Sequence, residues 1–346
     1  MAYTTIKKPS DYFNTKLYTG NNTSTSITGV GFQPDLTWFK RRDSSAQHSW
    51  FDSVRGVTKQ LTSNLTNADT TITDALTSFD SDGFTLGVDS GNYINFNSAT
   101  YVSWSWLGAN GTASNTDGSI TSTVSANTTS GFSIVSYTGN GTANSTIGHG
   151  LGTIPDFIIV KNRTTTQSWG TKNPAYNSPS DPGVLYLNST NATDSAQNVW
   201  GTSASFTTST FTVGDWTGSN QSGSNFIAYC WSAKQGYSKF GKYTGNGSTD
   251  GTFIYLGFKP AFVMIKRTGV EGWWMQDNKR TGFNPSNDRL EANDPAAEAD
   301  LNSIDILSNG FKCRQTYDGI NLSGNSYIYM AFAEEPLVGD NPATAR

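Results

Sequence analysis

Three segments of the chain alternate bulky and small side chains with a period of two residues. They are residues 101–106, 226–231 and 327–332. Because successive side chains of a β-strand point to opposite faces, each segment predicts a strand with one bulky face and one smaller face. The bulky faces carry Val102, Trp104, Trp106, Ile227, Tyr229, Trp231, Ile328, Met330 and Phe332. Since a fully buried large side chain contributes about 1.5–3 kcal/mol, we expect each strand to help build the core of its own folding unit.

Two further segments are apolar without alternation, at residues 157–160 and 262–265. This pattern is typical of strands that are covered on both faces. In a two-sheet sandwich, one face of a strand meets the core and the other normally meets water. Covering both faces needs a second partner, so the pattern predicts close packing between units or oligomerisation.

A repeated motif surrounds these strands. Tyr-Thr-Gly begins at Tyr18, Tyr137 and Tyr243, is followed each time by Asn, and precedes a proline by 16, 18 and 17 residues. Six residues after each proline stands a lysine, at Lys40, Lys161 and Lys266. Such spacing in three copies indicates an internal repeat. The sequence therefore predicts an all-β chain of three tandem homologous antiparallel β-sandwich modules, jelly-roll or lectin-like, with very little helix.

The copies define the expected boundaries. Modules are predicted at residues 1–111, 131–236 and 237–336, with a C-terminal tail at 337–346. Residues 112–130 are rich in Ser, Thr and Asn, which indicates a polar linker or, alternatively, a long polar edge strand. One short helix is predicted at residues 294–301, with Asp294 as N-cap and Pro295 in the first helical position.

Composition and charge remove several classes of protein. Charged residues make up 14% of the chain and aromatic residues 13%, the opposite of a disordered composition. A net charge of −4 and a pI near 5.2 argue against nucleic acid as a partner. No apolar run approaches the ~18 residues of a membrane span. Two cysteines form no disulfide framework. Since residues 1–9 lack a hydrophobic stretch, we expect no signal peptide and synthesis in a cytoplasm.

Catalytic and metal-binding patterns are weak. His48 and His149 lie in different copies, and the chain has no nucleophile elbow, Walker loop or Cys-x-x-Cys motif. Asp80 and Asp82, with Asp89 nearby, resemble the start of a calcium loop. The corresponding residues of the other copies, 307–310 and 208–210, hold one Asn and no acid, which favours a plain turn. The pair at 334–335, Glu-Glu, is interpreted as solvated charge. We expect no cofactor and no enzymatic activity.

The residues that could carry binding are aromatic and cationic. Sugars stack their C–H faces on flat rings, and neighbouring polar groups bind their hydroxyls. The candidate contacts for a glycan or a protein partner are Trp50, Phe51, Trp169, Trp273, Trp274, Lys40, Lys161, Lys266, Arg42, Arg163 and Arg267. Under the alternative interpretation, the tryptophans close the open ends of the sandwiches and the cations solvate strand ends.

Several phrases resemble a known family. They are Leu-Tyr-Thr-Gly-Asn at 17–21, Gly-Val-Gly-Phe-Gln-Pro-Asp at 29–35, Gly-His-Gly-Leu-Gly at 148–152, Pro-Asp-Phe-Ile-Ile-Val-Lys-Asn-Arg at 155–163 and Pro-Ala-Thr-Ala-Arg at 342–346. Together they resemble uncharacterised virion structural proteins of bacteriophages, especially marine ones. The resemblance implies lectin-like sandwich modules in a particle that assembles in the host cytoplasm, with other virion proteins as partners. It supplies no catalytic or binding residues.

Three roles follow from that resemblance. The first is a tail fibre or spike that presents the modules to host-surface glycan, usually as a homotrimer. The second is a decoration protein that stabilises the head, where three modules about a pseudo-threefold axis could sit on a capsid threefold. The third, a polysaccharide depolymerase, is disfavoured because the copies share no acids. Loop tryptophans and a Thr/Asn-rich surface favour the first role, although no heptad or collagen-like repeat is present to trimerise a shaft.

Overall fold

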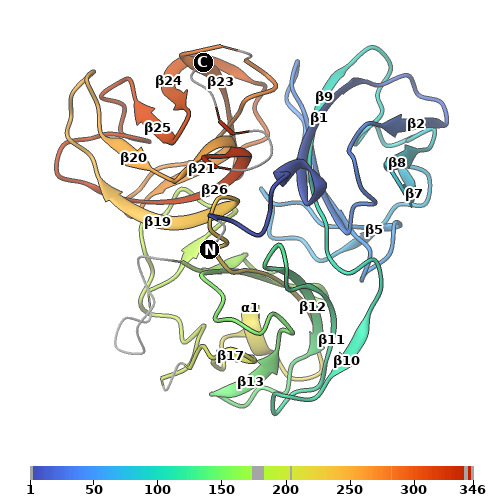
Figure 1. Ribbon diagram of the computed structural model, residues 1–346. Helices are drawn as coiled ribbons and strands as arrows, with labels where there is room; N and C mark the ends of the chain where they lie inside the picture. Colours follow the sequence, from blue (N-terminus) through green and yellow to red (C-terminus); the bar gives the residue numbers. More distant parts are fainter. Residues whose placement is uncertain (1–2, 174–182, 203–204, 282, 339–341, 344–346) are drawn as a thin grey trace.

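The computed structural model describes residues 3–173, 183–202, 205–281, 283–338 and 342–343 (Figure 1). Antiparallel sheets dominate the described part, and helix is limited there to α1 (Thr217–Asn220) and the 3-10 turn η1 (Pro9–Asp11). The prediction of an all-β chain with very little helix is therefore confirmed. Figure 1 shows three groups of strands around a common centre, which are coloured blue, green to yellow, and orange to red.

The first group, repeat 1, spans residues 13–106. Its larger sheet has the order β1-β9-β3-β4, a smaller sheet has the order β2-β8-β7, and β5 pairs with β6. The strands are β1 (Phe13–Thr19), β2 (Thr25–Thr28), β3 (Leu36–Arg41), β4 (Ser49–Asp52), β5 (Lys59–Gln60), β6 (Thr70–Thr71), β7 (Leu76–Asp80), β8 (Gly83–Leu86) and β9 (Thr100–Trp106).

Repeat 2 spans residues 132–231, and two strands from the preceding segment join its sheet. The order is β10-β11-β12-β18-β14-β15-β16, with β13 and β17 forming a separate pair. The strands are β10 (Ala113–Asn115), β11 (Ser122–Asn127), β12 (Phe132–Thr138), β13 (Ser145–Gly148), β14 (Phe157–Asn162), β15 (Gly170–Lys172), β16 (Leu185–Tyr186), β17 (Thr210–Val213) and β18 (Asn225–Trp231).

Repeat 3 spans residues 238–336 and forms one continuous eight-stranded sheet. Its order is β19-β26-β21-β22-β23-β24-β25-β20. The strands are β19 (Ser238–Thr244), β20 (Phe253–Tyr255), β21 (Phe258–Arg267), β22 (Trp273–Asp277), β23 (Ser286–Glu291), β24 (Ala299–Leu307), β25 (Gly310–Cys313) and β26 (Ser326–Pro336). The order β1-β9-β3-β4 of repeat 1 thus recurs as β12-β18-β14-β15 and as β19-β26-β21-β22.

The three central strands β9, β18 and β26 are buried on both faces. Their bulky faces belong to one hydrophobic cluster that draws residues from all three repeats. Each repeat has, in addition, a cluster of its own behind its central sheet. The expectation that bulky faces build separate cores is therefore wrong, because these faces meet one another across the centre of the molecule. Alternation specifies two faces but not which partner covers each of them.

Aromatic rings from different repeats meet in this shared core. The Trp106 ring lies 6.1 Å from that of Trp231 and 5.6 Å from that of Phe332, so the same strand position contributes a ring from each repeat. Phe13 adds a stacked contact to Phe332 at 5.0 Å. Such edge and offset contacts contribute about 0.5–1.5 kcal/mol each beyond the buried area. The apolar segments of β14 and β21 are fully buried, as their unbroken hydrophobicity predicts.

The repeated Tyr-Thr-Gly-Asn motif has a structural cause. Tyr18 stacks on Tyr101 at 5.1 Å and donates its hydroxyl to the Ile94 carbonyl at 2.8 Å. A Cβ at Gly20 would lie 2.3 Å from the Phe96 carbonyl oxygen, so no larger residue fits there. The corresponding stacked pairs are Tyr137 with Phe226 at 5.1 Å and Tyr243 with Tyr327 at 5.0 Å.

Two local expectations are corrected. The segment expected as a linker at 112–130 contains β10 and β11, which extend the sheet of repeat 2, so the alternative of polar edge strands holds. The helix expected at 294–301 is absent, because Pro295 and Glu298 make backbone hydrogen bonds to Ala46 and Arg42 of repeat 1 and β24 begins at Ala299. Most of the expected tail at 337–346 lies outside the described residues.

Replacing Trp231 by Ala tests whether the core is shared. We expect the free energy of unfolding to fall by about 3–5 kcal/mol, the usual cost of a large aromatic truncation in a core. Because Trp231 contacts Trp106, amide exchange should accelerate in β9 and β26 as well as in β18. Urea denaturation and hydrogen exchange measure both effects. Val88→Ser, at a side chain that is 52% exposed, is the control. Faster exchange confined to β18 would show that the repeats unfold independently.

Candidate interaction surface

The aromatic candidates for glycan contact are all buried. Their exposed fractions are 1% for Trp50, 0% for Phe51, 0% for Trp169, 1% for Trp273 and 3% for Trp274. Trp50, Trp169 and Trp273 belong to the shared core, Phe51 to the cluster of repeat 1 and Trp274 to that of repeat 3. A buried ring has no face open to a sugar. The expectation that these five rings contact glycan is therefore corrected: they are core residues.

Two of these tryptophans join neighbouring repeats. Trp169 of repeat 2 donates its indole N–H to the carbonyls of Thr62 and Leu65 in repeat 1, at 3.2 and 3.0 Å. Trp273 of repeat 3 donates to the Tyr186 carbonyl of repeat 2 at 2.9 Å.

Repeat 1 has His48 at the corresponding position. The His48 Nε2 atom lies 3.2 Å from the Asp294 carbonyl of repeat 3. Burial, and then the positive charge of Lys40, hold the pKa of His48 well below its ordinary value. The neutral imidazole thus takes the bonding role of the indole.

The three repeated lysines are buried as well, with exposed fractions of 1% for Lys40 and 0% for Lys161 and Lys266. Each ammonium group donates to backbone carbonyls. Burial lowers the pKa of Lys40 and Lys266 to about 8 and that of Lys161 to about 7. The expectation that these lysines contact an acidic ligand is corrected, because carbonyl oxygens of the chain already surround them.

The lysine bonds also cross between repeats. Lys40 donates to the Pro295 carbonyl of repeat 3 at 3.1 Å, and Lys161 donates to the Thr66 carbonyl of repeat 1 at 3.0 Å. Lys266 bonds within repeat 3, to the carbonyls of Arg267 and Gly269 at 2.5 and 2.8 Å.

The three candidate arginines are partly exposed but engaged. Arg42 forms a bidentate pair with Glu298 of repeat 3 at 2.8 and 3.0 Å. Arg163 pairs with Asp69 of repeat 1 at 2.8 Å. Arg267 donates to Asn325 at 3.0 Å within its own repeat. Two of the three thus bridge repeats.

The carboxylates that resemble the start of a calcium loop accept hydrogen bonds within turns. Asp82 accepts the backbone N–H groups of Gly29 and Gly31 at 3.0 and 2.7 Å. Asp80 accepts two hydroxyls, and Asp89 accepts the N–H groups of Ile94 and Asn95 at 2.6 Å. Among the described residues, no group of three or more His, Cys, Asp or Glu side chains is placed to hold a metal ion.

Backbone hydrogen bonds join the repeats into a closed ring. Among the described residues, each junction has two such bonds at corresponding places. They are Gln167 N–H to Thr66 O and Asp69 N–H to Arg163 O, Glu271 N–H to Thr190 O and Thr193 N–H to Thr268 O, and Ala46 N–H to Pro295 O and Glu298 N–H to Arg42 O. The last pair closes the ring between the first and last repeats.

That closing junction also holds buried charge. Asp277 and Arg280 form an ion pair at 2.6 Å with both side chains inaccessible, and Trp104 of repeat 1 donates to Asp277 at 3.1 Å. The same arrangement joins repeats 1 and 2, where Asp52 and Arg55 pair at 2.5 Å and the Tyr229 hydroxyl donates to Asp52 at 2.7 Å.

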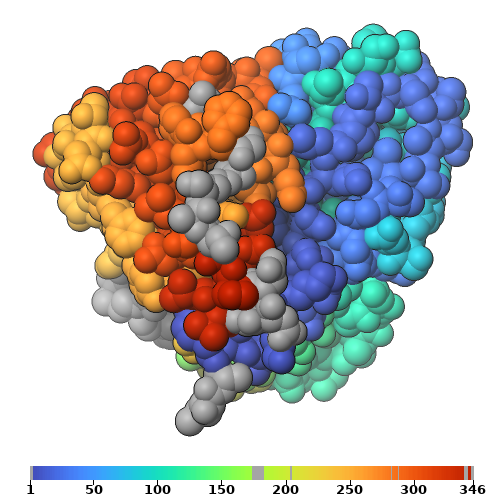
Figure 2. Space-filling view, turned by 45° about the horizontal axis from the view of Figure 1, so that its top comes forward, coloured from blue at the N-terminus to red at the C-terminus, as the bar shows by residue number. Residues whose placement is uncertain are grey.

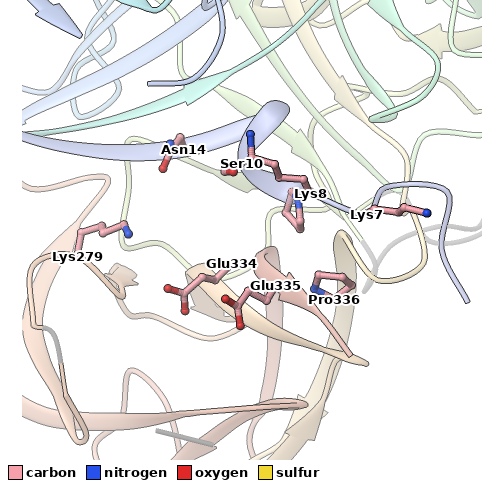
Figure 3. Close-up of a pocket in the computed structure, with 9 residues that line it drawn as sticks. Lys7, Lys8, Ser10, Asn14, Lys279, Glu334, Glu335 and Pro336 are labelled. Carbon is pink, nitrogen blue, oxygen red and sulfur yellow. The ribbon is translucent and has the colours of Figure 1, made fainter. Parts of the chain in front are cut away.

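A cavity of 510 Å³ opens at the junction of repeats 1 and 3. Figure 2 shows the blue and orange repeats meeting there, with the red end of the chain at the junction. In Figure 3, the segment that carries Lys8, Ser10 and Asn14 lies opposite Glu334 and Glu335 across the cavity. The lining residues are Lys7, Lys8, Pro9, Ser10, Asn14, Lys279, Glu334, Glu335 and Pro336.

The cavity has a mixed charge. Lys259 pairs with Glu334 at 3.0 Å. Burial would raise the pKa of Glu334, but hydrogen bonds from Lys259 and Asn278 and the charge of Lys279 hold it below its ordinary value. The lining residues include no histidine or cysteine, so ion pairing and hydrogen bonding are the chemistry that this cavity offers. Sequence reasoning missed it, because its walls come from opposite ends of the chain.

Comparisons with known proteins give one match. A family model described as "Domain of unknown function (DUF7483)" matches residues 8–336. No curated protein and no solved structure matches the chain. Within the described residues, no helix is long and apolar enough to cross a membrane.

Replacing Trp273 or Trp274 by Ala should reduce the stability of the fold. Because both rings are buried, we expect each change to lower the free energy of unfolding by about 3–5 kcal/mol. Urea denaturation measures the loss. Val270→Ala, at a side chain that is 66% exposed, is the matched control. If neither variant lost stability, the two rings would not be core residues.

Lys161 should make stability depend on pH. Its folded pKa is about 7 and its ordinary value is 10.5, so the unfolded chain binds one more proton between these values. Stability rises with pH wherever the unfolded state binds more protons. The free energy of unfolding should therefore rise from pH 7 toward pH 10.5 relative to that of Lys161→Met. If the free energies of unfolding of the two proteins changed with pH in parallel, the pKa of Lys161 would not be lowered in the folded protein.

Proposed function

We propose that this chain, which belongs to the DUF7483 family over residues 8–336, is a non-enzymatic structural protein of a bacteriophage particle. We further propose that its repeats are homologous β-sandwich modules of jelly-roll type, packed about a pseudo-threefold axis. In this role the protein decorates the head at threefold positions of the shell and has other virion proteins as partners.

The closed ring of equivalent junctions carries this proposal. Corresponding backbone groups bond at all three junctions, and corresponding strand positions supply Trp106, Trp231 and Phe332 to the shared core. A single chain with this arrangement offers three similar outer surfaces around one axis. Closed symmetric assemblies present repeated contacts in the same way.

A threefold position suits such a molecule because its contacts cooperate. Once one repeat binds a shell subunit, the other two lie close to equivalent subunits, and their effective concentration is high. Weak contacts of each repeat then sum to firm attachment. A monomer with three repeats needs no further trimerisation for this purpose.

Tail adhesion is the second candidate. Its original support, the loop tryptophans, is removed by their burial. One observation still favours it: Phe253 and Tyr255 on β20 are 44% and 50% exposed, and exposed rings suit the C–H faces of sugars. For depolymerase activity we find no corresponding support in the cavity, whose lining offers ion pairing.

Antibody-gold labelling of intact particles in the electron microscope tests the role. We expect label over the head, and cryo-electron microscopy of the same particles should place density of this size at threefold positions. Particles from a phage that lacks the gene are the control for antibody specificity. Label confined to the tail would overturn decoration in favour of adhesion, and particles without label would overturn the virion assignment itself.

A further inference from the structure

The edges of the three corresponding sheets differ. In repeat 2, β11 pairs with the outer edge of β12, in the register Ser125 to Ile134 and Thr123 to Ser136. Among the described residues, the corresponding strand of repeat 1, β1, ends its sheet and pairs with β9, and β19 likewise ends the sheet of repeat 3. The chain therefore covers an edge in repeat 2 that it leaves uncovered in repeat 1.

The uncovered edge of β1 presents backbone groups for pairing. Bonds of Leu107 to Tyr12 and of Gly20 to Ala99 fix which residues of β1 bond to β9. By the alternation of antiparallel ladders, Thr15 and Leu17 turn their backbone groups outward. The Thr15 N–H donates to the side-chain oxygen of Asn14 at 2.9 Å. This oxygen takes the position that a backbone carbonyl of an added strand would occupy.

A groove runs along this edge. A cavity of 320 Å³ is lined by Asn14, Thr15, Lys16, Leu17, Gly29 and, from repeat 3, Lys279. It shares Asn14 and Lys279 with the 510 Å³ cavity at the junction of repeats 1 and 3 (Figure 3). Space for an extended segment thus lies directly beside the outward-facing backbone groups of Thr15 and Leu17.

The charge of the groove indicates what could fill it. The cavity beside β1 is lined by two lysines, Lys16 and Lys279, and by no carboxylate. In the adjoining cavity, Lys8 is paired with Asp11 and Glu334 with Lys259. In a chain of net charge −4, this groove is a locally positive surface that complements an acidic segment.

We propose that the edge of β1 binds an extended acidic strand of a partner protein, antiparallel to β1, in the place that β11 takes in repeat 2. Addition of a strand to a sheet edge uses main-chain hydrogen bonds for affinity and alternate side chains for specificity. The identity of the partner as a shell protein rests on the proposed function, but binding of an acidic strand does not.

The contact of β11 with β12 sets the expected register. Ser125 pairs with Ile134 and Val124 with Val135, and the corresponding residues of β1 are Thr15 and Lys16. A side chain at the place of Val124 therefore stands opposite Lys16. An acidic residue there forms a cross-strand ion pair, and opposite charges across a sheet are favourable.

A peptide of residues 119–128 is the probe. One version carries Val124→Glu and Ala126→Glu, and a second carries Val124→Lys and Ala126→Lys. In fluorescence anisotropy with the full chain, we expect the acidic peptide to bind about tenfold more tightly than the basic one, a difference of ~1.4 kcal/mol. In NMR hydrogen exchange, the amide of Leu17 should become protected when the acidic peptide binds.

Two controls separate strand pairing from charge attraction. N-methylation of the acidic peptide at residues 123 and 125 removes the main-chain donors that face the edge and should abolish binding. In the protein, Lys16→Glu should weaken the acidic peptide about tenfold, whereas Lys59→Glu on β5 changes net charge equally and should leave binding unaltered.

Three outcomes would overturn the proposal. Equal affinity for the acidic and basic peptides would remove the charge argument, and undiminished binding of the N-methylated peptide would remove strand pairing. Binding to a chain shortened to residues 1–336 but not to the full chain would assign the groove to the protein's own C-terminal residues. If the acidic peptide binds while labelled particles lack the protein, only the virion role fails.

Discussion

Burial of the central sheets on both faces is the constraint on which the rest of the structure depends. Only 35% of the residues are hydrophobic, too few to give each repeat a generous core with a polar exterior. Concentrating the bulky faces of β9, β18 and β26 in one shared cluster solves this problem, because each ring is covered by rings from another repeat. A repeat on its own would expose that face to water, so we expect the three repeats to unfold together.

Polar groups between the repeats serve geometry more than stability. Buried ion pairs such as Asp277 with Arg280 lose much of their attraction to desolvation, and apolar replacements of such pairs are often as stable. Their directional bonds nevertheless distinguish one relative orientation of two repeats from another. The indole of Trp169 and the ammonium of Lys161 act similarly, because each binds carbonyls of repeat 1. We infer that apolar burial drives the assembly while these bonds fix its register.

Much of this fold can be predicted from the sequence, and the limits have physical reasons. Alternation at residues 226–231 and unbroken hydrophobicity at 157–160 correctly predict β18 and a strand buried on both faces, since periodicity reports burial directly. Periodicity does not indicate which segment covers each face, so it leads to the incorrect expectation that the bulky faces build separate cores. Lys266 is a charged residue at the end of an apolar strand and Trp273 follows a polar turn, so both resemble surface residues in the sequence. Their burial depends on contacts with distant segments, as does the cavity between Lys8 and Glu334.

The three repeats agree in their cores and differ at their edges. Core positions of the three repeats pack in similar surroundings, so the corresponding tyrosine stacks recur with nearly the same geometry. Edges face no such requirement, and there β11 covers one repeat while β1 stays uncovered. Three repeats that are alike inside and unlike at their edges can sit on a threefold axis in three orientations, yet present non-equivalent edges, because β11 covers β12 whereas β1 and β19 end their sheets. Attachment and specificity can therefore reside in separate parts of the same chain.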